Sequence, residues 1–170
     1  VKMILVTRNP MDNAVSKYHF RKKHPRQPID VPFHDFLHRE YLNGKTSYGS
    51  WWDWHKGWLK TYEKYAGEGE GFDGRVLFLS YKEMTADKRA AIVKVSNFLF
   101  KDPPLSEVVD KVLESTQIDG MKTKFDAKET HDNQKFLKVR KGGVGNWKDT
   151  FEEEDVVVFK EYHEKKSKWS

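Results

Sequence analysis

Two short apolar runs constrain the fold of this chain more than any other feature. Residues Met3–Thr7 read Met-Ile-Leu-Val-Thr, and residues Val76–Ser80 read Val-Leu-Phe-Leu-Ser. Continuous apolar runs of this length are typical of strands buried on both faces of a parallel sheet. The long stretch between them carries helical periodicity, and parallel strands need such a crossover connection. The sequence therefore predicts an α/β fold with a parallel sheet and flanking helices.

Helices are expected before and after the second strand. Asn9 is a suitable N-cap and Pro10 fits the first helical position, which predicts a helix to about His24. Apolar spacing predicts further helices ending near Gly44, beginning after Ser50, and over residues 87–100, around 108–113 and over 152–168. Ile92, Val95, Phe98 and Leu99 are expected to point inward. The residues that mark the other helices by their spacing, or line one apolar face of them, are Ala14, Val15, Tyr18, Phe33, Phe36, Leu37, Tyr41, Trp51, His55, Trp58, Leu59, Tyr62, Val108, Val109, Val112 and Leu113.

Two connecting segments have no apolar periodicity. Residues 67–71 alternate Gly and Glu and predict a mobile connection. Residues 122–140 are polar and charged, and loops of that length in a compact domain are usually functional or disordered. No linker divides the chain, so its 170 residues fit one domain or a large part of one.

The composition excludes several classes of protein. There is no Cys, so disulfides, thiolate metal sites and a Cys nucleophile are excluded. No apolar run is long enough to span a bilayer, and no signal peptide is visible, so we expect a cytoplasmic protein without a membrane partner. His19, His55 and His131 show no metal-ligand spacing, so no metal is expected. Seven Lys and Arg against one acid in the first 26 residues can attract an anionic ligand, although such a cluster is more commonly a solvated helix end.

Three segments carry a family resemblance. The first is Val6-Thr7-Arg8-Asn9-Pro10, leading into Ser16-Lys17-Tyr18-His19-Phe20. The second is Tyr48-Gly49-Ser50-Trp51, with His55 and Trp58 after it. The third is Arg140-Lys141-Gly142-Gly143-Val144-Gly145-Asn146-Trp147-Lys148-Asp149-Thr150-Phe151. In this order they resemble the cytosolic sulfotransferases, which transfer a sulfuryl group from 3′-phosphoadenosine 5′-phosphosulfate (PAPS) to a hydroxyl or amine of a small-molecule acceptor.

The resemblance implies a binding site for the donor and for its product, adenosine 3′,5′-bisphosphate, without a metal. The 3′-phosphate is a dianion and calls for guanidinium, hydroxyl and backbone N–H donors. The residues implied at the 3′-phosphate are Arg8, Ser16, Arg140, Lys141 and Gly142; those near the adenine are Tyr81, Thr116 and Ile118, where Ile118 replaces the usual aromatic residue. Tyr18 and Phe20 correspond to the acceptor pocket, and residues 122–139 to its lid.

Two parts of the family pattern have no counterpart in this sequence. No segment resembles the loop that holds the 5′-phosphosulfate, and the family's catalytic His precedes the Arg-Asn-Pro strand. We therefore expect residues 1–170 to be the C-terminal part of a single sulfotransferase domain. Its P-loop-type parallel sheet would be incomplete, and the chain alone would have no catalytic residue and no activity. Glu152-Glu153-Glu154-Asp155 replaces the family's dimerisation motif, which leaves the oligomeric state open.

Two other interpretations stay open at this point. The missing loop also allows a non-catalytic nucleotide-binding fragment or pseudoenzyme. The basic N-terminal cluster and the aromatic residues allow a nucleic-acid-binding domain, which would show a steep salt dependence. No signature of a known nucleic-acid module is present, so no nucleic-acid partner is expected.

Overall fold

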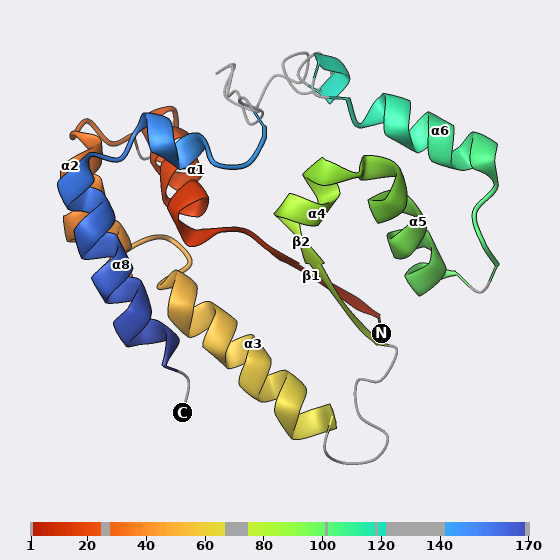
Figure 1. Ribbon diagram of the computed structural model, residues 1–170, viewed down its shortest axis with the longest axis horizontal. Coiled ribbons are helices and arrows are strands. Elements are labelled where there is room, and N and C mark those ends of the chain that lie inside the picture. The colour runs from red at the N-terminus through yellow and green to blue at the C-terminus, as the bar shows by residue number, and fades with distance from the viewer. Residues whose placement is uncertain are drawn as a thin grey trace. The chain divides into compact units, whose positions relative to one another are not determined.

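The computed structural model describes residues 2–24, 28–66, 75–100, 102–117, 119–121 and 142–168 (Figure 1). The chain divides into two compact units, which are described separately. The first unit comprises Val1–Arg8, Phe20–Ile29 and Gly74–Val144, and the second comprises Asn9–His19, Asp30–Asp73 and Gly145–Ser170. Within the described residues, no helix combines the length and the apolar character needed to cross a membrane.

The first unit contains both predicted strands, side by side in Figure 1. Strands β1 (Met3–Thr7) and β2 (Val76–Ser80) pair in parallel, in a register that runs from Met3 opposite Val76 to Thr7 opposite Ser80. The sequence prediction of their position and direction is thus confirmed.

Burial on both faces of these strands, however, is incomplete among the described residues. Leu5 and Leu79 are buried, whereas Val6 is 48% and Phe78 is 38% exposed. Leu5 lies opposite Phe78, and Val6 lies opposite Leu79. Each face of the sheet therefore carries one buried and one exposed apolar side chain among these four residues.

Three helices follow β2 in the first unit. Helix α4 (Tyr81–Ala86), which was not predicted, begins directly after the strand because Ser80 and Glu83 form a reciprocal capping box. Helix α5 (Lys88–Leu99) starts at the cap residue Asp87, and α6 (Ser106–Ser115) comes next. Of the residues predicted to point inward on α5, Ile92, Val95 and Phe98 are half-buried and Leu99 is exposed. On α6, Val109 is buried, whereas Val108 and Val112 are exposed.

The second unit is helical. Helix α1 (Pro10–Lys22) belongs to it as far as His19, and begins as predicted, because the Asn9 side chain accepts hydrogen bonds from the backbone of Met11 and Asp12. Its other elements are α2 (Phe33–Phe36), the π-helical turn η1 (Leu37–Tyr41), α3 (Trp51–Ala66), the 3₁₀ turn η2 (Asn146–Asp149) and α8 (Glu153–Ser167). The predicted stop at Gly44 has the left-handed φ of 65° that glycine tolerates.

Aromatic side chains fill the core of the second unit. Trp52 is 1% and Phe159 is 2% exposed, and their ring centroids lie 5.6 Å apart. The Trp52 indole N–H also donates to His163 of α8. The face of α3 that the apolar spacing marks does not include Trp52, and Leu59 on that face is 39% exposed. Helix α8 contacts α3 through Trp52, one residue beyond that face.

Candidate functional site

The first predicted site residue, Arg8, directly follows β1. Its guanidinium carbon lies 4.4 Å from the centroid of the Tyr81 ring, and its Nη2 donates to the carbonyl oxygen of Gly143 at 3.3 Å. Its Nε is buried and has no hydrogen-bond partner among the described residues. The structure therefore brings together Arg8, Tyr81 and the glycine segment of the third motif.

The sheet register explains why Arg8 and Tyr81 meet. Thr7 lies opposite Ser80 at the carboxyl ends of the two parallel strands, so the next residue of each strand leaves the same edge of the sheet. Tyr81 is then fixed as the first residue of α4 by the capping box at Ser80. In open parallel sheets, ligands bind outside the carboxyl ends of the strands.

The glycine segment brings backbone close to the guanidinium. Gly142 and Gly143 have φ values of 67° and 85°, which side-chain-bearing residues rarely adopt. The segment contacts Arg8 through a carbonyl, which accepts one guanidinium N–H and leaves the buried Nε–H for another acceptor. A buried donor without a partner costs free energy unless a ligand satisfies it, so this arrangement suits an anion such as a phosphate.

Of the other predicted nucleotide residues, Ser16 and Thr116 are described, and three lie outside the described residues. Ser16 is partly buried in the part of α1 that belongs to the second unit. Thr116 caps the end of α6, where its hydroxyl donates to the carbonyl of Val112 at 2.8 Å. Ile118, Arg140 and Lys141 lie outside the described residues, as do residues 122–139, assigned to the lid, and 67–71, assigned to a mobile connection.

The two residues predicted for the acceptor differ in their exposure. Tyr18 is 7% exposed, packs its ring against Phe33 and donates its hydroxyl to the carbonyl of Val31 at 2.9 Å. Phe20 is 44% exposed and lies beside the ring of His24. The hydroxyl of Tyr18 is thus engaged within the second unit.

Asp12 is an anchoring residue that the sequence analysis missed. It is 2% exposed, and its carboxylate accepts hydrogen bonds from the backbone N–H groups of Gly145 at 2.8 Å and Trp147 at 3.1 Å. It thereby ties the start of α1 to the second half of the third motif. A sequence signal for Asp12 was available, because an acidic residue in the first turn of a helix is a ready acceptor for backbone N–H groups. Nothing in the neighbouring sequence indicates which distant N–H groups it binds.

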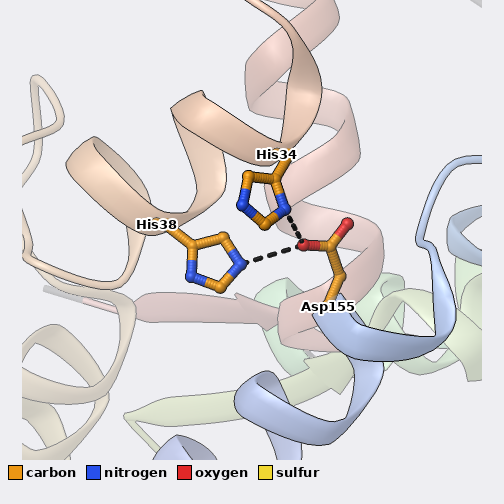
Figure 2. A group of neighbouring side chains, drawn as sticks. All are labelled: His34, His38 and Asp155. Atoms are coloured by element: carbon orange, nitrogen blue, oxygen red, sulfur yellow. Dashed lines mark hydrogen bonds and ion pairs between the residues drawn. The ribbon is translucent and has the colours of Figure 1, made fainter.

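A second missed cluster lies in the second unit, where the side chains of His34, His38 and Asp155 converge (Figure 2). His34 Nδ1 and His38 Nε2 donate to the same carboxylate oxygen of Asp155, at 2.8 Å and 2.9 Å. The sequence does contain a signal for this cluster. Two His residues four positions apart share one helix face, a spacing that is typical of metal ligands.

The second unit also has a pocket of about 480 Å³. It is lined by residues 9–11 at the start of α1 and by α8 residues between Phe159 and Lys168. None of the described residues that were predicted for the site is among those that line this pocket.

Comparison with known proteins places the chain in a family. The sequence profile of the sulfotransferase domain matches residues 1–170. Sulfotransferase 1 family member D1 of Rattus norvegicus is 35% identical over 97% of this chain and 54% of its own length. Sulfotransferase 1B1 of Canis lupus familiaris is 33% identical over 94% of this chain and 54% of its own length. The chain thus spans about half the length of the curated relatives it matches.

Solved structures agree with this comparison. The crystal structure of mouse sulfotransferase SULT7A1 complexed with PAP matches 98% of this chain and 59% of its own, with a TM-score of 0.81 and 30% identity. Retinol dehydratase, solved in complex with androsterone and inactive cofactor PAP, matches 99% of this chain and 48% of its own, with a TM-score of 0.78 and 23% identity. The predicted α/β sulfotransferase fold is confirmed.

Proposed function

The chain belongs to the sulfotransferase family, and from this premise we propose that the protein transfers a sulfuryl group from PAPS to a hydroxyl or amine of a small-molecule acceptor. This chain supplies the half-site for the 3′-phosphate of the nucleotide. The similarity to a sulfotransferase solved with PAP, which is the product nucleotide adenosine 3′,5′-bisphosphate, supports the proposal. When bound, the donor supplies the sulfuryl group, and the residues of this chain hold its nucleotide.

The observation that carries the proposal is the arrangement around Arg8. A buried Nε–H without a partner among the described residues, a guanidinium held over Tyr81 and a close glycine backbone together suit a phosphate dianion. We assign Arg8, Ser16, Arg140, Lys141 and Gly142 to the 3′-phosphate, on the motif positions that they occupy. Two guanidinium groups can each form paired, charge-assisted hydrogen bonds, which a Lys cannot reproduce.

The remaining assignments follow the same motifs. Tyr81, Thr116 and Ile118 are assigned to the adenine; one face of the Tyr81 ring carries the Arg8 guanidinium, so its other face and its edge serve the base. Tyr18 and Phe20 are assigned to the acceptor pocket. Because the Tyr18 hydroxyl already donates to Val31, Tyr18 contributes its ring to this pocket and not its hydroxyl. We also propose that residues 1–170 are part of one sulfotransferase domain in a cytoplasmic protein.

Binding selectivity tests the nucleotide half of the proposal. Calorimetric titration of the protein with adenosine 3′,5′-bisphosphate and with adenosine 5′-phosphate compares two ligands that differ only in the 3′-phosphate. The proposal predicts that the bisphosphate binds about tenfold to a hundredfold more tightly, since each hydrogen bond to a charged group contributes roughly 1.5–3 kcal/mol. Equal affinities would contradict it.

An assay of sulfuryl transfer tests the catalytic half of the proposal. Incubation with PAPS and a panel of phenols, alcohols and amines is expected to show no sulfated product for the 170-residue chain alone, because no segment of it resembles the phosphosulfate loop. A longer protein that contains this chain and such a loop is expected to form sulfated product from PAPS and an acceptor. Selective nucleotide binding without turnover by that longer protein would favour the non-catalytic alternative.

A further inference from the structure

We propose that His34, His38 and Asp155 form a binding site for a divalent first-row transition metal ion, with zinc as the best match. This site is built wholly within the second unit and does not depend on the proposed sulfuryl transfer. The three side chains come from α2, η1 and α8, and Figure 2 shows both rings turned toward one carboxylate.

The geometry is close to that of an occupied site. One ligand atom from each of the three residues lies within 4.8 Å of the others, and both ring nitrogens point to the same Asp155 oxygen at 2.8 Å and 2.9 Å. Zinc takes His nitrogen and carboxylate oxygen ligands at about 2.0–2.2 Å, so ligand atoms around a tetrahedral ion lie about 3.3 Å apart. The two hydrogen-bond distances therefore need to open by about half an ångström to admit the ion, and the two ring nitrogens, which lie within 4.8 Å of each other, need to lie at the same spacing of about 3.3 Å.

The backbone positions the three ligands before any ion binds. His34 and His38 lie four residues apart on one helix face, and their ring centroids are 4.2 Å apart. Asp155 belongs to the capping box of α8, in which its other oxygen accepts the backbone N–H of Glu152 at 3.4 Å. That contact orients the carboxylate and leaves the remaining oxygen facing the rings. Such outer contacts support metal affinity.

The charge balance at Asp155 also favours a cation. Its side chain is 1% exposed, and among the described residues the side chains that contact its carboxylate are the two imidazoles, not a Lys or Arg. A buried carboxylate needs a compensating charge. A dication supplies it, and the proton on each coordinating nitrogen moves through solvent to the other nitrogen of its ring, so neutral imidazoles lose no net proton.

The site is accessible and has room for a fourth ligand. The side chains of His34 and His38 are 44% and 26% exposed, which gives an ion a path from solvent. The carboxylate of Glu154 lies 3.5 Å from His34 Nδ1 and is 70% exposed, so it or a water molecule can complete the coordination. Two imidazoles and a carboxylate suit zinc and its neighbours better than Ca²⁺ or Mg²⁺, which prefer oxygen ligands throughout.

A bound metal ion would cross-link parts of the chain that are distant in sequence. Asp155 is 121 residues from His34 and 117 from His38. The unfolded chain does not hold these ligands together, so the ion binds the folded state preferentially and stabilises it.

Metal titration of the purified protein, stripped with a chelator, tests the site. We expect zinc to bind with one-to-one stoichiometry by calorimetry, and the melting temperature to rise with zinc and fall again with chelator. Co²⁺ is expected to give the intense visible absorption of a four-coordinate ion, which zinc then displaces. Absence of zinc binding, or the weak spectrum of six-coordinate Co²⁺, would overturn the proposal.

Substitutions assign the ligands. His34→Gln and His38→Gln keep a side-chain N–H donor for Asp155, and each is expected to weaken zinc binding by at least about tenfold. His24→Gln, in the first unit, is the matched control and is expected to leave binding unchanged. Full-affinity binding by the double variant His34→Gln/His38→Gln would show that the ion binds elsewhere. Circular dichroism and the melting temperature of each stripped variant separate lost binding from lost fold.

Discussion

The guanidinium carbon of Arg8 lies 4.4 Å from the centre of the Tyr81 ring, which joins the residue after β1 to the residue after β2. The parallel register of the two strands produces this pairing, since Thr7 and Ser80 end their strands opposite each other. The contact orients a guanidinium whose Nε–H has no partner among the described residues. Tyr81 is therefore a positioning residue for Arg8 as well as a candidate contact for the base.

The first prediction concerns the Tyr81 ring. Tyr81→Leu should weaken binding of adenosine 3′,5′-bisphosphate by about twofold to thirtyfold, because a cation–π contact contributes roughly 0.5–2 kcal/mol. Tyr81→Phe keeps the ring and should retain most of the affinity. Phe100→Leu, at a residue that is 64% exposed in the same unit, is the control. Calorimetry measures all three; an equal loss in Tyr81→Phe and Tyr81→Leu would contradict the role given to the ring.

The second prediction concerns Asp12. Asp12→Asn should lower the free energy of unfolding by roughly 2–4 kcal/mol, because the buried carboxylate accepts two backbone N–H groups and an amide offers a single acceptor and a competing donor. Asp53→Asn, at an exposed residue in the first turn of α3, should change it by less than about 0.5 kcal/mol. Urea unfolding measures both, and similar midpoints for the two variants would show that Asp12 is not an anchor.

The third prediction concerns the aromatic core of the second unit. Trp52→Ala should lower the free energy of unfolding by about 3–5 kcal/mol, because it leaves a cavity against Phe159. Trp52→Phe should cost less but still destabilise, since His163 loses the indole N–H that donates to it at 2.9 Å. Trp54→Ala, at a residue that is 41% exposed, is the comparison in denaturant unfolding. A larger loss for Trp54→Ala than for Trp52→Ala would contradict the assigned core.

Local signals in the sequence sufficed for much of the fold. Asn9 and Pro10 fix the start of α1 through caps that involve neighbouring residues, and the two apolar runs coincide with β1 and β2. The buried face of α3 was not predictable in this way. Trp51 and Trp52 are equally apolar, and only the position of α8 buries the second of them.

The candidate site, too, was predictable only where neighbouring residues carry the signal. Arg8, Tyr81 and Gly142 were identified by motif, and the structure places Arg8 against Tyr81 and the neighbouring Gly143. Asp12 and the His34–His38–Asp155 cluster were missed. The acidic first turn and the i, i+4 pair of His residues are local signals, but the partners that complete the contacts, Gly145 and Asp155, lie more than a hundred residues away in sequence. No local pattern specifies those distant partners, whereas a turn or a helix cap is specified by adjacent residues.

The fourth prediction concerns the pH dependence of stability. Burial lowers the pKa of His55 below its usual 6.5, against the opposing hydrogen bond from its Nδ1 to the Trp51 carbonyl. The unfolded chain therefore binds a proton near pH 6.5 that the folded chain binds only at lower pH. Because the unfolded state binds this proton first, the free energy of unfolding is highest above pH 6.5. It falls as the pH drops from 6.5 through the lower pKa of His55 in the folded state.

Urea unfolding at several pH values between 7.5 and 5 tests this prediction against His55→Asn, whose amide N–H can replace the Nδ1 donor but does not titrate. Other titrating groups are common to both proteins, so the difference between their pH profiles isolates His55. The variant should lose less stability than the parent on acidification. Parallel profiles would show that His55 titrates alike in the folded and unfolded states.

The most direct measurement of the central claim is the preference for adenosine 3′,5′-bisphosphate over adenosine 5′-phosphate in Arg8→Ala and Arg140→Ala, made in the longer protein. Each variant should lose about tenfold to a hundredfold in bisphosphate affinity, and Arg8→Lys should restore only part of it, because a point charge cannot reproduce the guanidinium fork. Affinity for the monophosphate should change little in all three. Retention of the full bisphosphate preference by both alanine variants would contradict the account and place the 3′-phosphate elsewhere.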